Sequence, residues 1–249
     1  MKAAVVIPAR MASTRFPGKP LADVCGKPMI QWVYERASRA KSIARVIVAT
    51  CDREILEAVA AFGGEAVMTS DRHRSGTDRV AEAASCLDVD VVVNVQGDEP
   101  LIDPCSIDKA VEPFSAEADT VMTSLMVPIA PESARDPNLV KVVVSLSNHA
   151  LYFSRSPIPY ERNAGAGKQR ARIYGHVGLY AYTKEFLLRF ASLEPTPLEM
   201  AESLEQLRVL EHGYKIKMVE ITDRPMGVDT REDLERVKAF ICANIEAWR

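Results

Sequence analysis

The sequence contains no long hydrophobic run. No stretch approaches the about 18 to 20 consecutive apolar residues that a membrane-spanning helix needs. The apolar run near the N-terminus is short and is soon followed by Arg10, which is not the pattern of a signal peptide. These features argue against a membrane protein and a secreted one, so we expect a cytoplasmic protein without a membrane partner.

Cysteines are few and scattered. Their number is odd, and no two of them form a C-x-x-C pair, so the sequence predicts neither a disulfide framework nor a zinc site. This favours a reducing compartment. The five cysteines are Cys25, Cys51, Cys86, Cys105 and Cys242.

Neither sign of charge dominates the chain. It has 31 lysines and arginines against 34 aspartates and glutamates, a formal net charge of −3. A chain so close to neutral is not a general nucleic-acid binder, and an anion site in it must be a local cluster of cations. Hydrophobic residues make up 47% of the 249 residues, which is enough for a substantial core.

Short apolar segments alternate with segments of helical spacing over the first 95 residues. This alternation predicts a parallel sheet covered by helices. Beyond residue 119 the β-rich segments are longer and close together, which predicts a mixed or antiparallel extension of the same sheet. The expected strands are 3–7, 45–50, 65–69, 89–95, 120–129, 140–154, 173–183 and 215–221, and the expected helices are 29–40, 54–62, 77–87, 200–211 and a last one from Thr230 with a core stripe of Leu234, Val237, Ile241, Ile245 and Trp248.

Three polar loops follow strands of the predicted parallel sheet. They read IPARMASTRFPGKPL (7–21), TSDRHRSGTDRV (69–80) and NVQGDEPLI (94–102). In a parallel α/β sheet, ligands bind beyond the carboxyl ends of the strands. We therefore expect the three loops to meet at one crevice.

The first loop carries cations but no acid. Arg10, Arg15 and Lys19 could neutralise a polyphosphate, and Gly18 allows backbone N–H groups to come close to phosphate oxygens. The loop is not a Walker A motif, and the GAGK segment at 165–168 lacks the rest of that motif as well. The alternative is an exposed basic turn, and composition alone does not decide between the two.

Two aspartates are candidate ligands of Mg²⁺. Asp98 lies at a strand end, and Asp229 precedes the helix that Thr230 begins. Mg²⁺ uses one or two carboxylates and completes its shell with water and phosphate oxygens. When each residue is taken singly, a turn at Asp98 and a helix cap at Asp229 are the better interpretations. When the two are considered together with the basic loop, the sequence favours a metal site more strongly.

The other candidate residues could hold the organic parts of a ligand. A base or ribose could lie across Ser75, Gly76 and Arg79, although Thr77 could equally be a plain helix cap. In the second half, His176 and Tyr180 share a face of a predicted strand. Cationic and hydrogen-bonding side chains there suit an acidic, hydroxyl-rich ligand, and a solvated loop with an amphipathic strand explains the pattern equally well: the set includes Arg155, His176, Tyr180, Glu205 and Gln206.

The motifs together resemble the 3-deoxy-manno-octulosonate cytidylyltransferase family, in order and from residue 5 to about residue 237. The opening loop is shared with CMP-sialate synthetases, whereas the combination of QGDEP, IPY and EQLR is more specific. Phe16 stands where leucine is usual, Cys51 replaces a usual acid, and YERN varies the usual ending of its motif. The motifs are IPARMASTRFPGKPL, HRSGTDRVAE, VVNVQGDEPLI, SRSPIPYERN, YGHVGLYAY, LEQLRVLEHGYKI and GVDTREDLERV.

The resemblance implies an α/β fold of the Rossmann-like nucleotide-diphospho-sugar transferase type, as a single domain over 1–249 with dimerisation and sugar-binding elements mainly within 120–215. It implies a reaction of CTP with the sugar acid Kdo that gives CMP-Kdo and pyrophosphate for lipopolysaccharide biosynthesis, with Mg²⁺ as cofactor and a homodimer as the assembly. The alternatives are a CMP-sialate synthetase and a nucleotide-binding regulator that performs no chemistry.

The resemblance also assigns roles to residues. Lys19, Arg15 and Asp98 match catalytic positions, and Asp98 and Asp229 match metal ligands. The nucleotide side corresponds to Arg10, Arg15, Lys19, Ser75, Gly76, Arg79 and Asp98, and the sugar side to Gln96, Arg155, His176, Tyr180, Glu205 and Gln206.

Overall fold

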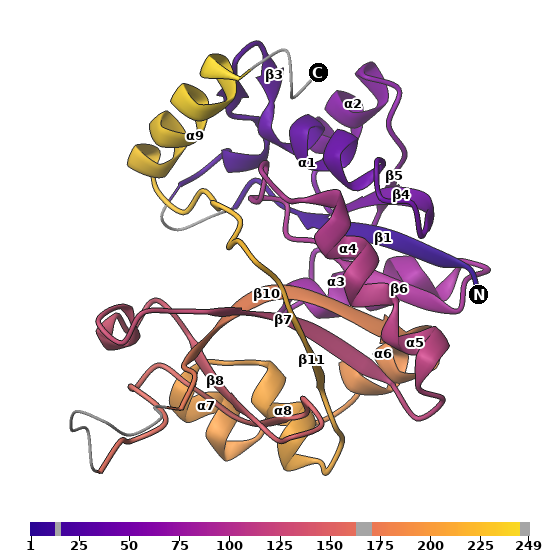
Figure 1. Ribbon diagram of the computed structural model, residues 1–249. Helices are drawn as coiled ribbons and strands as arrows, with labels where there is room; N and C mark the ends of the chain where they lie inside the picture. The colour runs from indigo at the N-terminus through magenta and orange to yellow at the C-terminus, as the bar shows by residue number, and fades with distance from the viewer. Residues whose placement is uncertain (13–15, 163–170, 245–249) are drawn as a thin grey trace.

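The body of the protein is a central β-sheet between layers of helices (Figure 1). The computed structural model describes residues 1–12, 16–162 and 171–244. The strands are β1 (Ala3–Ala9), β2 (Asp23–Val24), β3 (Lys27–Pro28), β4 (Ile43–Thr50), β5 (Ala66–Met68), β6 (Val91–Asn94), β7 (Met122–Pro128), β8 (Lys141–Val144), β9 (Ala150–Ser154), β10 (Tyr174–Thr183) and β11 (Lys217–Glu220). Seven of them lie in the order β11-β7-β10-β6-β1-β4-β5; β8 pairs with β10 and β9, and β2 pairs with β3 in a separate hairpin.

Helices cover both faces of the sheet. The α-helices are α1 (Met29–Ala37), α2 (Arg53–Ala61), α3 (Gly76–Ser85), α4 (Pro104–Val111), α5 (Pro113–Ala116), α6 (Lys184–Ala191), α7 (Pro197–Glu202), α8 (Gln206–Glu211) and α9 (Arg231–Ala243). Within the described ranges, no helix has both the length and the apolar character to span a bilayer.

Alternate residues of β1 enter two different cores. Val5 and Ile7 pack in a cluster that includes residues of α1, α2 and α4. Ala4 and Val6 pack in a second cluster with residues of α3, α6 and α8. A strand buried on both faces has no polar side, which is why β1 and its neighbour β6 are almost continuous apolar runs in the sequence.

The mixed sheet agrees with the expectation from the sequence. β1 pairs in parallel with β4 and β6, and β4 pairs in parallel with β5. β10 runs antiparallel to both β6 and β7, and β11 is parallel to β7. The carboxyl ends of β1, β4, β5 and β6 therefore lie at one edge, from which the three polar loops leave.

The single helix expected over 200–211 is wrong, because two short helices occupy this part of the chain. α7 ends at Glu202, and Ser203 adopts the left-handed backbone conformation, with φ of 53°. A residue in that conformation terminates a helix. The leucine pattern still predicted burial correctly, because Leu204 and Leu207 both enter the second core.

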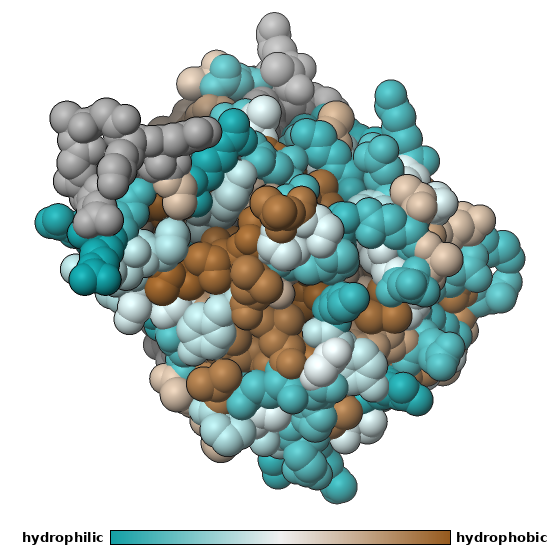
Figure 2. Space-filling view, turned by 60° about the horizontal axis from the view of Figure 1, so that its bottom comes forward, coloured by the Kyte–Doolittle hydropathy of each residue, from teal (hydrophilic) through white to brown (hydrophobic). Residues whose placement is uncertain are grey.

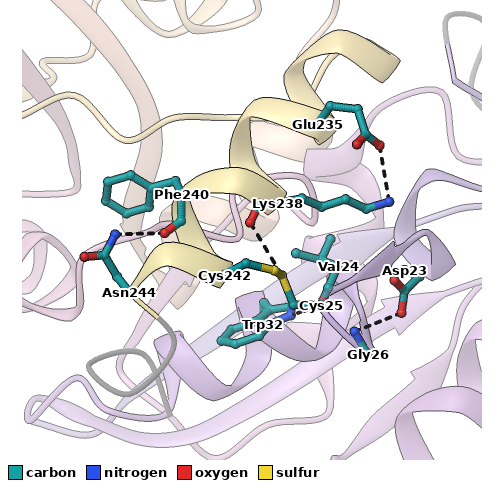
Figure 3. The surroundings of a disulfide bond; sticks show 10 residues. All are labelled: Asp23, Val24, Cys25, Gly26, Trp32, Glu235, Lys238, Phe240, Cys242 and Asn244. Atoms are coloured by element: carbon teal, nitrogen blue, oxygen red, sulfur yellow. Dashed lines mark hydrogen bonds and ion pairs between the residues drawn. A yellow bond between two sulfur atoms is a disulfide. The ribbon is translucent and has the colours of Figure 1, made fainter.

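Cys25 and Cys242 form a disulfide, which corrects the expectation that the chain has none (Figure 3). Cys25 lies in the turn between β2 and β3, and Cys242 lies in the last turn of α9. Their sequence separation is 217 residues, so no local spacing could reveal the pair. Chain topology brings them together, because α9 packs on the β2–β3 hairpin next to Trp32, whose indole N–H donates to the Val24 carbonyl at 2.8 Å.

A third apolar cluster holds α9 in this place. Leu234, Val237 and Ile241 of α9 are buried against Trp32 of α1. The same cluster contains Phe16, Val24, Met29, Leu101 and Val228. The last two residues of the expected stripe, Ile245 and Trp248, lie outside the described residues.

Candidate active site

The three polar loops do converge, on a cavity of about 310 Å³. The loop after β1 supplies Arg10 and Lys19, and the loop after β6 supplies Asp98. Between them lie the residues that begin α3. The lining consists of Pro8, Ala9, Arg10, Ala12, Lys19, Pro20, His73, Ser75, Gly76, Arg79, Gln96, Gly97 and Asp98.

Backbone contacts fix the described parts of the basic loop. The N–H of Met11 donates to the carboxylate of Asp52 at 2.7 Å, and the N–H of Gly18 donates to the carbonyl of Met11 at 3.0 Å. Gly18 has φ of 73°, a value that glycine adopts without steric cost. Arg15 lies between these anchors but outside the described residues.

Lys19 lies between the two aspartates that the sequence singled out. Its Nζ forms an ion pair with the Asp98 carboxylate, donates to the Val228 carbonyl at 2.9 Å, and is 3.9 Å from Oδ1 of Asp229. Its side chain is only 12% exposed. The two carboxylates, 131 positions apart (229 − 98), thus face one ammonium group.

The loops that carry these aspartates are joined through the backbone. The N–H of Val228 donates to the carbonyl of Asp98 at 2.9 Å. A Cβ on Gly227 would lie 3.7 Å from that same carbonyl oxygen, so the two chains approach closely. The position of Asp229 relative to Asp98 is therefore set by main-chain contact as well as by charge.

Ser75, rather than Thr77, is the N-cap of α3. Its hydroxyl accepts from the N–H of Asp78 at 3.1 Å, and the Asp78 carboxylate accepts from the N–H of Ser75 at 3.1 Å. This capping box fixes the start of the helix at the cavity wall. Thr77 instead donates to Oε2 of Glu205 at 2.6 Å, which ties α3 to the segment before α8.

Arg79 lines the cavity but is 4% exposed. Its guanidinium donates to the hydroxyl of Thr69 and, at 3.4 Å, to the carbonyl of Ser70. The side chain therefore holds the loop after β5 against α3. Arg10, by contrast, is exposed at the mouth of the same cavity.

A second cavity of about 980 Å³ lies beside the first, and Asp98 lines both. Asp229, Glu99 and Arg224 also line the second cavity. The site therefore has two compartments, and a residue of the proposed metal pair lies where they meet. This arrangement suits two substrates whose reacting groups must come together beside Asp98.

Several buried polar side-chain atoms have no hydrogen-bond partner within the described chain, and one of them belongs to Glu99, which lines the second compartment. They include Oε2 of Glu99, Oε1 of Glu205 and Nε2 of Gln206. Leaving such an atom unpaired costs about 1–3 kcal/mol. A ligand rich in hydroxyl groups would supply the missing partners.

The same acids surround Tyr180. Burial, followed by the negative charges of Glu205 and Glu99, raises the pKa of Tyr180, so its hydroxyl stays protonated. Burial raises the pKa of Glu205, and burial together with the charge of Asp98 raises the pKa of Glu99 to about 8. The ring of His176 lies 5.5 Å from that of Tyr180, so the two share a face as the sequence predicted.

Arg155 lines the second cavity, yet its guanidinium is bound by the chain itself. It donates to the carbonyls of Glu202 at 2.8 Å, Pro137 at 3.1 Å and Ser203 at 3.4 Å. Gln96 lines the first cavity rather than the second, and its amide donates to Asn94 at 3.2 Å. The donors of Arg155 are thus already used within the chain, and Gln96 belongs to the first compartment.

Sequence reasoning missed Glu99 and Arg224. Glu99 directly follows Asp98 in the QGDEP motif, and that adjacency was the available signal. Arg224 lies in the segment before Asp229, and its positive charge acts on both Glu99 and His176. Nothing in the spacing around Arg224 marks it as a site residue.

The donor set fits Mg²⁺. The described residues contain no group of three or more His, Cys, Asp or Glu side chains arranged to hold a metal, and Mg²⁺ bound together with phosphates needs only one or two carboxylates. The Lys19 ammonium lies between the Asp98 and Asp229 carboxylates as a stand-in cation. The place is therefore already suited to positive charge.

Comparisons with known proteins identify relatives of the chain. A family model described as cytidylyltransferase matches residues 4–216. The chain is 53% identical over 245 residues to a 3-deoxy-manno-octulosonate cytidylyltransferase of Geotalea uraniireducens, covering 95% of this chain and 98% of that protein. It is 52% identical over 247 residues to the Geobacter metallireducens protein of the same name, covering 95% and 96% of the two chains.

Solved structures give the same result. The structure of a CMP:2-keto-3-deoxy-manno-octonic acid synthetase complexed with CTP superposes with a TM-score of 0.94 at 45% identity, covering 98% of this chain and all of that chain (100%). The structure of a putative glucose-1-phosphate thymidylyltransferase from Bacillus anthracis superposes with a TM-score of 0.67 at 17% identity, covering 96% of this chain and 94% of that chain. At this identity the similarity shows a shared fold alone.

Proposed function

Because the chain belongs to the 3-deoxy-manno-octulosonate cytidylyltransferase family, we propose that it joins CTP to Kdo and releases CMP-Kdo and pyrophosphate. The single observation that carries this proposal is the pair of compartments that meet at Asp98. The first has the cations and helix start that suit a nucleotide, and the second is lined by Arg224 and by Glu99, whose unpaired Oε2 suits a hydroxyl-rich sugar acid. The 249 residues act as one catalytic domain, with sugar-binding elements mainly in 120–215.

The proposed reaction needs no nucleophile from the protein. The anomeric hydroxyl of the sugar attacks the α-phosphorus, the new O–P bond forms as the bond to pyrophosphate breaks, and the hydroxyl proton leaves to solvent. Catalysis of this kind depends on positioning and on neutralising phosphate charge. Arg10, Arg15 and Lys19 bind the triphosphate, while Ser75 and Gly76 place the nucleoside at the start of α3.

Mg²⁺ is the proposed cofactor, held by Asp98 and Asp229. When bound, it neutralises charge on the phosphate oxygens. In the structure Lys19 lies between these carboxylates, so a cation held by Asp98 and Asp229 would compete with the Lys19 ammonium, which would then be available to the triphosphate. Glu205, Gln206 and the protonated Tyr180 offer hydrogen bonds to the sugar hydroxyls.

The proposed function is tested by measuring pyrophosphate release. CTP and Mg²⁺ are supplied with a panel of sugar acids that includes Kdo, its 8-amino analogue and sialic acid. Turnover with Kdo at a kcat/KM at least about 100-fold above that with the others is expected. Preference for sialic acid would make the protein a CMP-sialate synthetase, and CTP binding by calorimetry without turnover of any sugar would make it a nucleotide-binding regulator.

The proposal includes a homodimer. Figure 2 shows hydrophobic side chains gathered on the face that carries α7, α8 and the β8–β9 hairpin. Leu151 of β9 is 62% exposed and Met200 of α7 is 65% exposed. Sedimentation analysis of the wild type should give twice the monomer mass, and Leu151→Asp with Met200→Asp should give the monomer; a monomeric wild type contradicts this part.

The proposed compartment is the cytoplasm, where a nucleoside triphosphate is available, and the proposed use of the product is lipopolysaccharide biosynthesis. The scattered cysteines of the sequence favoured a reducing compartment, but the Cys25–Cys242 disulfide removes that argument. What supports the compartment is therefore the substrate alone.

A further inference from the structure

Ser124 lies behind His176, at an irregularity in the sheet. Ser124 belongs to β7 and is fully buried, and it is the partner in register of Tyr180 on β10. The next pair along the two strands is Leu125 with Val177, so the register shifts there and two residues of β10 have no partner on β7. Carbonyl groups in such a bulge need hydrogen bonds from elsewhere.

The Ser124 hydroxyl supplies one of those bonds and also faces the ring of His176. Its Oγ is 2.9 Å from the carbonyl oxygen of Leu179, 3.4 Å from that of Val177, and 2.8 Å from Nε2 of His176. A hydroxyl has one hydrogen, and a carbonyl oxygen can only accept. The arrangement that pairs each of these close atoms with a partner of the opposite kind donates the hydrogen to Leu179 and has Oγ accept from His176, so that Nε2 carries the ring proton.

His176 is neutral as well as oriented. Burial, with the positive charge of Arg224 as the smaller cause, lowers the pKa of His176 to about 3. With the proton on Nε2, the lone pair of Nδ1 is the hydrogen-bond acceptor of the ring. Phe153 and Tyr180 pack on the ring at centroid distances of 5.0 and 5.5 Å, which restricts its rotation.

We propose that Ser124 is a positioning residue, which holds His176 as the Nε2–H tautomer so that Nδ1 accepts a hydrogen bond from a hydroxyl group of the sugar acid. The inference rests on the proposed function, because it takes His176 to be part of the sugar compartment. It also states which part of the substrate His176 recognises. An acceptor nitrogen repels a carboxylate, so His176 contacts a hydroxyl.

The tautomer is read in the ligand-free protein. Long-range ¹H–¹⁵N correlation of histidine-labelled protein distinguishes Nε2–H from Nδ1–H, and His176→Gln identifies the signal among the four histidines. We expect Nε2–H in the wild type and a mixture of tautomers in Ser124→Ala. An Nδ1–H signal in the wild type overturns the proposal, even if Ser124→Ala does not fold.

Kinetics separate positioning from general support of the strand. Ser124→Ala should raise the KM for Kdo about five- to tenfold, the effect of one hydrogen bond, and leave the KM for CTP within about twofold. Ser124→Thr, which keeps the hydroxyl, should restore the tautomer and most of the KM. The matched control is Thr123→Val, since the Thr123 hydroxyl is equally buried in β7 but donates to the Ala110 carbonyl at 2.7 Å.

Equal changes in the two KM values of Ser124→Ala, or the same pattern in Thr123→Val, overturn the proposal. Absence of wild-type turnover with Kdo would instead refute the proposed function, and the tautomer measurement would still decide the hydrogen-bond arrangement.

Discussion

Loss of the Cys25–Cys242 disulfide should strongly lower the free energy of unfolding. The bridge joins residues with a sequence separation of 217, so it closes most of the chain into one loop. In the chain-entropy model a loop of that length reduces the entropy of the unfolded state by about 18 cal/mol/K, equivalent to about 5 kcal/mol at 25 °C. Residual structure in the unfolded chain makes this an upper bound.

The folded state should survive the loss of the bridge. Leu234, Val237 and Ile241 bury the apolar face of α9 against Trp32 whether or not the sulfur atoms are joined. The effect therefore comes mainly from the unfolded chain. At a urea m-value of about 3 kcal/mol/M, this upper bound corresponds to a fall of about 1.7 M in the midpoint of unfolding, and we expect a fall of about 1 M.

Two measurements test this reasoning. Thiol titration in denaturant should find three thiols in the protein as purified, because Cys51, Cys86 and Cys105 are the free cysteines among the five. Urea unfolding then compares the wild type with Cys25→Ser/Cys242→Ser. The matched control is Cys86→Ser/Cys105→Ser, which removes two exposed free thiols and should leave the midpoint unchanged. Five titratable thiols, or equal midpoints for wild type and Cys25→Ser/Cys242→Ser, would refute it.

Three further predictions concern the site. Lys19→Met should bind Mn²⁺ several-fold more tightly than the wild type in the absence of nucleotide, because the ammonium no longer competes for Asp98 and Asp229. The same variant should turn over CTP at least about 100-fold more slowly. Electron paramagnetic resonance measures the Mn²⁺ affinity, and an unchanged affinity contradicts the interpretation of Lys19 as a stand-in cation. Asp98→Asn should keep the circular dichroism spectrum but lose at least about 100-fold in kcat with saturating CTP and Kdo, and near-normal turnover would exclude Asp98 as a metal ligand. The pKa of His176 is lowered to about 3, so the unfolded chain binds a proton at this residue below pH 6.5 while the folded protein does not, and the free energy of unfolding falls by about 1.4 kcal/mol per pH unit as the pH drops from 6.5 toward 3. Urea unfolding at pH 7, 6 and 5 should therefore show a smaller dependence of the free energy of unfolding on pH for His176→Gln than for the wild type. An equal dependence in the two proteins would contradict the lowered pKa.

The parallel half of the fold was predictable because its signals are local. A strand buried on both faces must be apolar throughout, so β1 and β6 stand out in the sequence. Once those strands are placed, the carboxyl ends of the sheet fix where the loops meet. That reasoning predicts that Lys19 and Asp98 lie at one cavity, and the structure confirms it.

The features that were missed depend on contacts distant in sequence or on single backbone conformations. The Cys25–Cys242 pair forms only because α9 returns to the β2–β3 hairpin. The break between α7 and α8 depends on the left-handed conformation of Ser203, a residue that helices also accommodate. Arg155 matches a family motif, but its donors are used by the carbonyls of Glu202 and Ser203 at this break and by that of Pro137. The pattern of residue types in the sequence does not show such distant contacts or such a backbone conformation.

The polar site owes its geometry to an apolar cluster that takes no part in the chemistry. Phe16 lies within the basic loop, Val228 precedes Asp229, and both are buried in the cluster that holds α9. Val228 also donates its N–H to the Asp98 carbonyl and accepts from Lys19 through its own carbonyl. One buried valine therefore joins the lysine to the two aspartates from which the metal site is proposed. Charge alone could not hold Asp229 beside Lys19, because the Asp229 side chain is 56% exposed and exposed ion pairs contribute only about 0–1 kcal/mol each. Burial of the residues between them does so, and for this reason the site needs the last helix of the chain as much as its first loop.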